Sequence, residues 1–85
     1  MDAMAHENLK NELRGIIAEI IEKDAKEIAD EVPLRELGVD SMQAIEIITD
    51  IERRYRIKID ESEFKNVTTL TSVHLFVAGK LDAQA

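Results

Sequence analysis

The sequence predicts an all-α fold, a four-helix bundle of three longer helices and one short helix with a long first loop. Apolar residues recur at helical spacing in three separate segments of the chain. The 85 residues include only three glycines and one proline, which favours long helices over a turn-rich β fold. We therefore treat residues 1–85 as one domain with a core at about residues 6–81.

The first helix is expected over about residues 6–23. Its apolar residues follow one another in steps of one, three or four along one helix face: Leu9, Leu13, Ile16, Ile17, Ile20 and Ile21. Residues 24–40 then form the long loop, because Pro33 and Gly38 both interrupt a helix. We expect its apolar side chains to hold it against the core: Val32, Leu34, Leu37 and Val39.

The second helix should begin at Asp40 or Ser41 and run to about Arg54 or Tyr55. Asp is a preferred N-cap, and Gln43 three residues later completes the pattern of a capping box. The apolar stripe of this helix contains Met42, Ala44, Ile45, Ile47, Ile48, Ile51 and Tyr55. Because β-branched isoleucines are not strong helix formers, tertiary packing must hold this helix together.

Residues 56–59 alternate polar and apolar side chains, as a short strand would. With no partner strand elsewhere, we expect an extended loop whose apolar side chains turn inward: Ile57 and Ile59. Asp60 then caps a short helical turn, with Glu63 in the capping-box position and Phe64 as its anchor.

The last helix is expected to start near Thr68 or Thr69 and to end near Gly79. Its apolar face contains Leu70, Val73, Phe76 and Val77. The tail over residues 80–85 should fray, apart from Leu81.

The chain is acidic, with a net charge of −7 from 18 acidic and 11 basic residues. This balance disfavours nucleic acid and anionic membrane surfaces as partners. It suits docking onto basic patches of other proteins, although such a charge also serves solubility. We expect a monomer.

Several other classes of site are not predicted. There is no cysteine for a disulfide or a thiolate metal site, and residues 60–63 lack the pattern of a calcium loop. The polar segment Met1–Asn8 does not resemble a signal peptide, and no apolar run is long enough to span a membrane. We therefore expect a cytoplasmic protein without a metal site or membrane insertion.

The most informative stretch is Glu36–Met42, where a glycine and an acidic cap precede a serine in the first turn of a helix. This order places the Ser41 hydroxyl at an exposed helix N-terminus, where unpaired N–H groups and the helix dipole favour a negative group. A phosphodiester attached there would gain from both effects. Locally, a serine that only caps the helix explains the same residues.

Catalysis by the chain itself is not predicted. Ser41 lacks the G-x-S-x-G surroundings of a nucleophile elbow, and the only histidines are His6 near the start and His74. His74 falls on the apolar side of the last helix, where we expect a partly buried, hydrogen-bonded histidine.

The segment Leu37-Gly38-Val39-Asp40-Ser41-Met42 resembles the signature of acyl carrier proteins. Three other segments also resemble the corresponding segments of that family: Glu46 to Ile48, Glu52 to Ile59, and Asn66 to Leu70. The resemblance covers most of the chain, from about Leu9 to Gly79.

This resemblance implies that a phosphopantetheinyl transferase moves phosphopantetheine from coenzyme A onto Ser41, and that the arm's thiol then carries an acyl group. Asp40 would help the transferase position its metal ion and the serine, and Gly38 and Met42 complete the attachment site. The isoleucine-rich face of the second helix would line a core that parts to shelter the acyl chain. The lack of cysteine is consistent, because the sulfur is imported.

By the same resemblance, acyl-loading and acyl-processing enzymes of fatty-acid, polyketide or related lipid biosynthesis would bind the second helix. The expected contact residues are Met42, Gln43, Glu46, Asp50 and Glu52. The chain departs from the fatty-acid members at Met42, usually leucine, and at Gln43, usually acidic. It also places four bases within six residues: Arg53, Arg54, Arg56 and Lys58. These departures favour a specialised carrier.

Three alternatives remain at this point. An aminoacyl or peptidyl carrier would share the fold and the arm. A helical adaptor without a prosthetic group would tolerate Ser41→Ala, whereas a carrier would lose all activity. A small hydrolase would turn over an ester.

Overall fold

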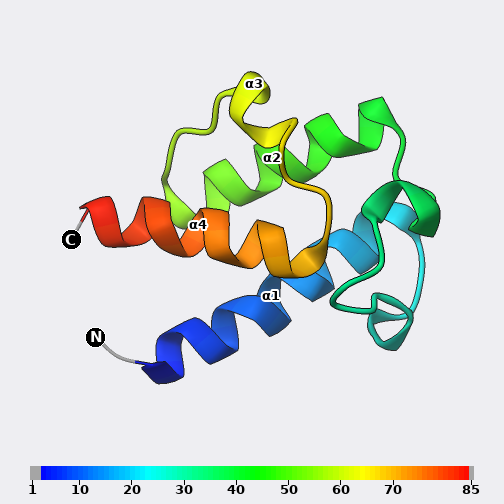
Figure 1. Ribbon diagram of the computed structural model, residues 1–85, viewed down its shortest axis with the longest axis horizontal. Coiled ribbons are helices and arrows are strands. Elements are labelled where there is room, and N and C mark those ends of the chain that lie inside the picture. Colours follow the sequence, from blue (N-terminus) through cyan, green and yellow to red (C-terminus); the bar gives the residue numbers. More distant parts are fainter. Residues whose placement is uncertain (1–2, 85) are drawn as a thin grey trace.

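The computed structural model describes residues 3–84, and side chains over residues 8–83. Figure 1 shows the four α-helices of this part of the chain: α1 (Ala3–Ile21), α2 (Ser41–Tyr55), the short α3 (Glu61–Phe64) and α4 (Leu70–Gln84). Two 3₁₀ turns lie in the first loop: η1 (Ala25–Glu27) and η2 (Leu34–Leu37). The described residues contain no strand, so the predicted all-α fold is confirmed.

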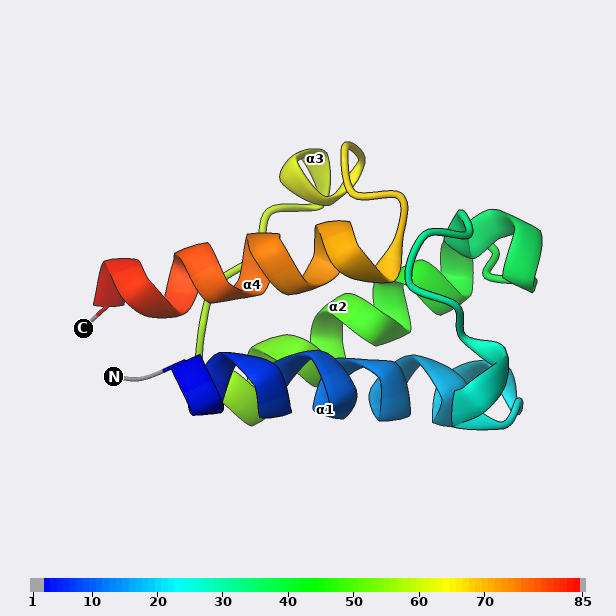
Figure 2. The same cartoon turned by 60° about the horizontal axis from the view of Figure 1, so that its bottom comes forward.

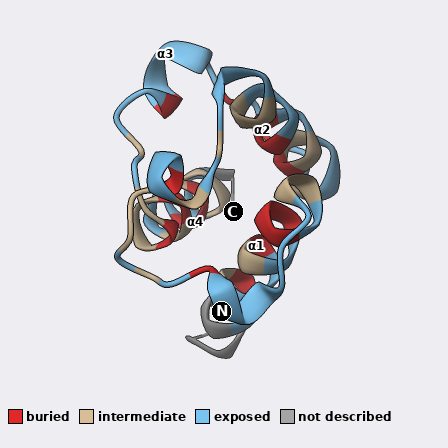
Figure 3. Ribbon diagram, turned by 90° about the vertical axis from the view of Figure 1, so that its right-hand side faces the viewer, coloured by how far each residue is buried: buried red, intermediate tan, exposed pale blue. Residues whose placement is uncertain are grey.

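Helix α1 packs against both α2 and α4, and all three contribute to one core. Both α2 and α4 run in the opposite direction to α1 (Figure 1). Helix α3 lies on the far side of the molecule from α1 in both views (Figure 2). Figure 3 shows the buried residues on the sides of the long helices that face one another. Burying each large apolar side chain contributes on the order of 1.5–3 kcal/mol.

The long first loop is held against the core more firmly than the sequence suggests. Ile28, which the apolar pattern did not single out, is fully buried. Of the four expected anchors, Leu34 is buried, Leu37 and Val39 pack against the core, and Val32 is half-buried outside the core cluster. The backbone N–H of Leu34 also donates to the Thr68 carbonyl oxygen at 2.7 Å.

Charged side chains of α1 also hold this loop. Asp30 forms ion pairs with Lys10 and Arg14, each at 2.9 Å, and the Arg14 guanidinium donates to the carbonyl oxygen of Ile28. Hydrogen bonds from Lys10 and then Arg14 lower the pKa of the Asp30 carboxyl below its usual value. The loop is therefore an ordered part of the fold.

The predicted boundaries of α2 are confirmed, but those of α1 and α4 differ. Helix α1 begins before residue 6 and ends at Ile21, and Glu22 follows with a positive φ of 59°. Helix α4 continues through Gly79 to Gln84, so the expected fraying of the tail was wrong for these residues. Tertiary contacts explain the extension, because Lys80 pairs with Glu63 at 3.0 Å.

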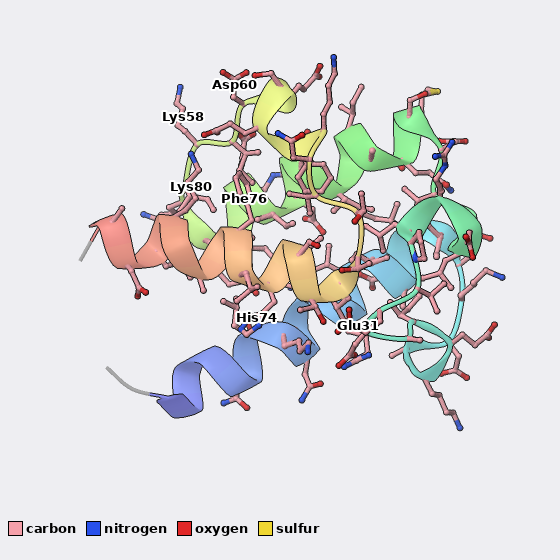
Figure 4. The ribbon with its side chains drawn as sticks, in the orientation of Figure 1. Glu31, Lys58, Asp60, His74, Phe76 and Lys80 are labelled. Atoms are coloured by element: carbon pink, nitrogen blue, oxygen red, sulfur yellow. The ribbon has the colours of Figure 1, made fainter. Side chains whose placement is uncertain are left out.

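Figure 4 shows how α4 and α3 meet at this end of the molecule. Phe76 packs edge-on against Phe64, with ring centroids 6.4 Å apart, and the Lys80 ammonium lies 5.4 Å from the Phe76 ring centroid. Leu81 also packs against the core.

The connection from α2 to α3 has the predicted inward side chains, Ile57 and Ile59, both buried. The backbone N–H of Ile59 donates to the Glu52 carboxylate at 2.7 Å. The N–H of Asp60 donates to Glu63 at 3.2 Å, which confirms the second capping box. At the end of α2, the Tyr55 hydroxyl donates to Glu12 on α1 at 2.6 Å, and burial raises the pKa of Tyr55.

Candidate functional site

Ser41 is the first residue of α2, and its side chain is exposed. Asp40 before it caps the helix: its Oδ1 accepts the Gln43 N–H at 2.8 Å, and its own N–H donates to Gln43 Oε1 at 3.2 Å. The predicted capping box is thus confirmed. It fixes the backbone on both sides of Ser41 and so fixes the point from which the hydroxyl projects.

Gly38 produces the turn between η2 and this cap. Its φ of 104° lies in the left-handed region, which residues other than glycine adopt only with strain. Two hydrogen bonds close the turn: Gly38 N–H to the Arg35 carbonyl at 3.2 Å and Val39 N–H to the Leu34 carbonyl at 3.1 Å. The turn directs the chain from the first loop into α2.

A pocket of about 400 Å³ lies beside Ser41, bounded by η2, the first half of α2, α3 and the segment leading to α4. Most of its lining is apolar: Pro33, Leu34, Val39, Ala44, Ile45, Ile48, Phe64 and Val67. The charged side chains that line it are Arg35, Asp40, Glu61 and Lys65. Ser41 therefore opens onto a space suited to an apolar group attached to its hydroxyl.

The apolar stripe of α2 divides between two surroundings. Ile47 and Ile51 are fully buried in the core, whereas Ile45 and Ile48 line the pocket. Met42 is 77% exposed. Ile45 is 47% exposed, so the expectation that the isoleucine-rich face lines the core was wrong for Ile45. The neighbouring helices cover a narrower band of α2 than the apolar pattern spans.

The expected contact residues of α2 do not all lie free on its surface. Met42 and Glu46 are exposed one turn apart, on the same side of the helix. Gln43 is half-buried and bonded within the cap, and Glu52 is half-buried and bonded to the Ile59 N–H. Asp50 is half-buried, and its Oδ2 lies 3.7 Å from Nε of Arg54. Exposed Ile45, which that set omitted, lies between Met42 and Glu46.

His74 points from α4 toward α1 (Figure 4) and is not among the described residues that line the pocket beside Ser41. Its Nε2 is buried without a hydrogen-bond partner among the described residues, so the expected hydrogen bond is wrong for this nitrogen. The side chain of His6 lies outside the described residues. Among the described residues no histidine lines the pocket at Ser41, so this part of the chain offers no serine–histidine pair there.

Within the described part of the chain, no group of three or more His, Asp or Glu side chains is placed to bind a metal ion. None of the helices in that part is both long and apolar enough to cross a membrane. The residues around Ser41 do fit a covalently attached arm, because the hydroxyl is exposed, projects from a capped helix start and lies next to an apolar pocket.

Comparison with known proteins agrees with this geometry. The family model described as "phosphopantetheine attachment site" matches residues 11–74. The chain is 32% identical over 73 residues to the polyketide-8 synthase acyl carrier protein 2 of Streptomyces avermitilis, covering 85% of this chain and 84% of that protein. It is 40% identical over 57 residues to the anthracycline acyl carrier protein DpsG of Streptomyces peucetius, covering 67% of this chain and 68% of that protein.

An acyl carrier protein of Thermotoga maritima is 23% identical over 78 residues, covering 91% of this chain and 96% of that protein. These matches favour the carrier over the adaptor and the hydrolase. The chain belongs to the phosphopantetheine-binding family of acyl carrier proteins, which carry acyl groups on a phosphopantetheine arm and are not themselves catalysts.

Proposed function

We propose that Ser41 carries the phosphopantetheine arm and that a phosphopantetheinyl transferase attaches it there from coenzyme A. The observation that supports this most is the placement of Ser41, an exposed hydroxyl on the first residue of α2 beside an apolar pocket. The arm supplies a terminal thiol that holds the acyl group as a thioester. The chain itself has no cysteine for this purpose.

Asp40 has two roles in this proposal. One carboxylate oxygen accepts the Gln43 N–H and fixes the start of α2. The side chain is nonetheless exposed, so its other oxygen is accessible to the transferase and its metal ion. Gly38 contributes the left-handed turn that brings Asp40 and Ser41 to the helix start.

The pocket between α2 and α3 is the proposed shelter for the acyl chain. Its apolar lining would keep the chain out of water, and its volume of about 400 Å³ falls within the range of small-molecule sites. Ile45 and Ile48 form its wall on α2, and Phe64 forms its wall on α3.

The partner enzymes are acyl-processing synthases, and we assign their contact to Met42, Ile45 and Glu46 near Ser41. Two exposed apolar side chains beside an exposed carboxylate suit a partner that offers an apolar hollow next to a basic group. The names of the relatives support a polyketide-type pathway over the housekeeping fatty-acid pathway.

Residues 1–85 act as a single domain and as a monomer in this proposal. The radius of gyration of 11.9 Å supports the first point, because a compact domain of this length has about 12 Å. Light scattering on the purified chain would test the second.

The attachment is tested by intact mass after incubation with coenzyme A and a broad-specificity phosphopantetheinyl transferase. We expect the parent chain to gain one phosphopantetheine and Ser41→Ala to gain none. Ser62→Ala, at an exposed serine on α3, is the matched control and should load like the parent. Loading of Ser41→Ala, or no loading of a folded parent by an active transferase, would contradict the proposal.

A further inference from the structure

Two cations line the pocket beside Ser41 from different elements. Arg35 belongs to η2, and Lys65 directly follows α3. Both are exposed, and neither side chain forms a hydrogen bond or ion pair with another described residue. Several other cations do pair with carboxylates: Lys10, Arg14, Arg54 and Lys80. Arg35 and Lys65 therefore remain available to an anion that arrives later.

Without Arg35 and Lys65, the other charges at this pocket would repel such an anion. Asp40 and Glu61 line the same space, and the whole chain carries a net charge of −7. A phosphodiester added at Ser41 would share this pocket with the two carboxylates and would be repelled by them. Opposite charges on both sides of the new group would offset that repulsion.

We infer that Arg35 and Lys65 hold the phosphodiester of the arm from two sides and so direct the arm across the mouth of the pocket. This inference rests on the proposed attachment at Ser41, since the phosphodiester is bonded directly to that hydroxyl. The Arg35 guanidinium can donate two parallel hydrogen bonds to the non-bridging oxygens, and Lys65 adds a point charge. Both are positioning residues.

The consequence is a salt-dependent orientation of the arm. Charges at an exposed site interact over about 10 Å at 0.1 M salt but only about 3 Å at 1 M. The arm should therefore be held at low salt and released at high salt. Without the two cations, its environment should not respond to salt.

The experiment compares the ³¹P chemical shift of the loaded protein at low and high salt. The double variant Arg35→Gln/Lys65→Gln removes both cations. The matched control, Arg53→Gln/Lys58→Gln, removes two exposed cations that do not line this pocket. All four substitutions lie on the surface, so folding is expected to be retained, and amide spectra of each variant check this. Intact mass confirms that every sample carries the arm.

We expect the parent and the control variant to show a salt-dependent ³¹P shift, and the Arg35/Lys65 variant to lose it. The Arg35 side-chain Nε–Hε signal of the parent should also move between the unloaded and loaded forms. A salt response retained in the Arg35/Lys65 variant, with loading confirmed by mass, would overturn the inference and leave the proposed function intact.

The same Arg35 signal separates the arm from its cargo. Loading from propionyl-coenzyme A and from malonyl-coenzyme A should move it equally, because both of the resulting acyl-phosphopantetheine arms carry the phosphodiester. Movement only with the malonyl group would mean that the cations bind a cargo carboxylate, which would overturn the inference. A parent that gains no mass would contradict the proposed function and this inference together.

Discussion

At the residue scale, the region of Ser41 is built by two neighbours with different tasks. Gly38 adopts a positive φ of 104° and turns the chain, and Asp40 caps the helix that follows. The cap satisfies N–H groups at the start of α2 that would otherwise lack partners. The Ser41 hydroxyl forms no hydrogen bond with any other residue that the structure describes.

The two tasks of Asp40 can be separated by substitution. Asp40→Asn should keep the stability of the parent, because asparagine caps helices as well as aspartate does. It should nevertheless slow loading by the transferase, because it removes the charge offered to the metal ion. Urea unfolding measures the first quantity, and mass spectrometry over time measures the second.

Asp40→Ala is the companion variant and should lose about 1 kcal/mol of unfolding free energy. Glu46→Ala, an exposed residue on the same helix, serves as the control for stability. If Asp40→Asn loads at the parent rate, the carboxylate contributes to loading only through the cap.

At the element scale, the first loop behaves as an ordered element because α1 and α4 both hold it. Lys10 and Arg14 bind Asp30 from α1, and the Thr71 N–H of α4 donates to the Asp30 carbonyl oxygen at 3.2 Å. Glu31 accepts a hydrogen bond from the Thr71 hydroxyl at 2.8 Å. This loop leads into η2, so its position determines one wall of the pocket.

The Asp30 contacts predict a dependence of stability on pH. The folded pKa is lowered, so the contribution is fully present above the ordinary value of 3.8 and is lost as pH falls through the lowered pKa. Because the side chain is 39% exposed, solvent screening limits the contribution to at most about 1 kcal/mol.

Asp30→Asn should therefore be less stable than the parent at neutral pH, and the difference should shrink below pH 3.8. Thermal unfolding across the pH range measures this. A difference of the same size at acidic and neutral pH would show that the Asp30 charge is not its source.

At the scale of the whole molecule, one small core carries the stability of the fold. Domains are stable by only about 0.05–0.15 kcal/mol per residue, so a chain of this size has little reserve. Ile28 joins that core from the loop and is fully buried. Truncating the Ile28 side chain should therefore lower the free energy of unfolding of the whole domain.

Ile28→Ala should cost about 2–5 kcal/mol, because it opens a cavity between the loop and the helices. Ile28→Val should cost about 0.5–1.5 kcal/mol by the same reasoning. Leu75→Ala, at a side chain that is 65% exposed, is the control and should change little. Urea unfolding would measure all three, and a small effect of Ile28→Ala would mean that the loop can detach from a stable bundle.

The sequence by itself determined the features that depend on neighbours along the chain. Helical periodicity predicted the long helices, and spacing of three residues predicted both capping boxes, at Asp40 and at Asp60. The signature around Ser41 indicated the family that the comparisons establish. These features are local because their hydrogen bonds join residues three or four apart.

Only the tertiary structure decided which faces are covered. Periodicity placed Ile45 on the isoleucine-rich face that was expected to line the core, but its side chain is 47% exposed. Glu52 looked like a surface contact and instead accepts the Ile59 N–H. Ile28 is buried, and α4 continues past Gly79, because distant segments supply their partners. Such contacts join residues far apart in sequence, and a periodic pattern contains no record of them.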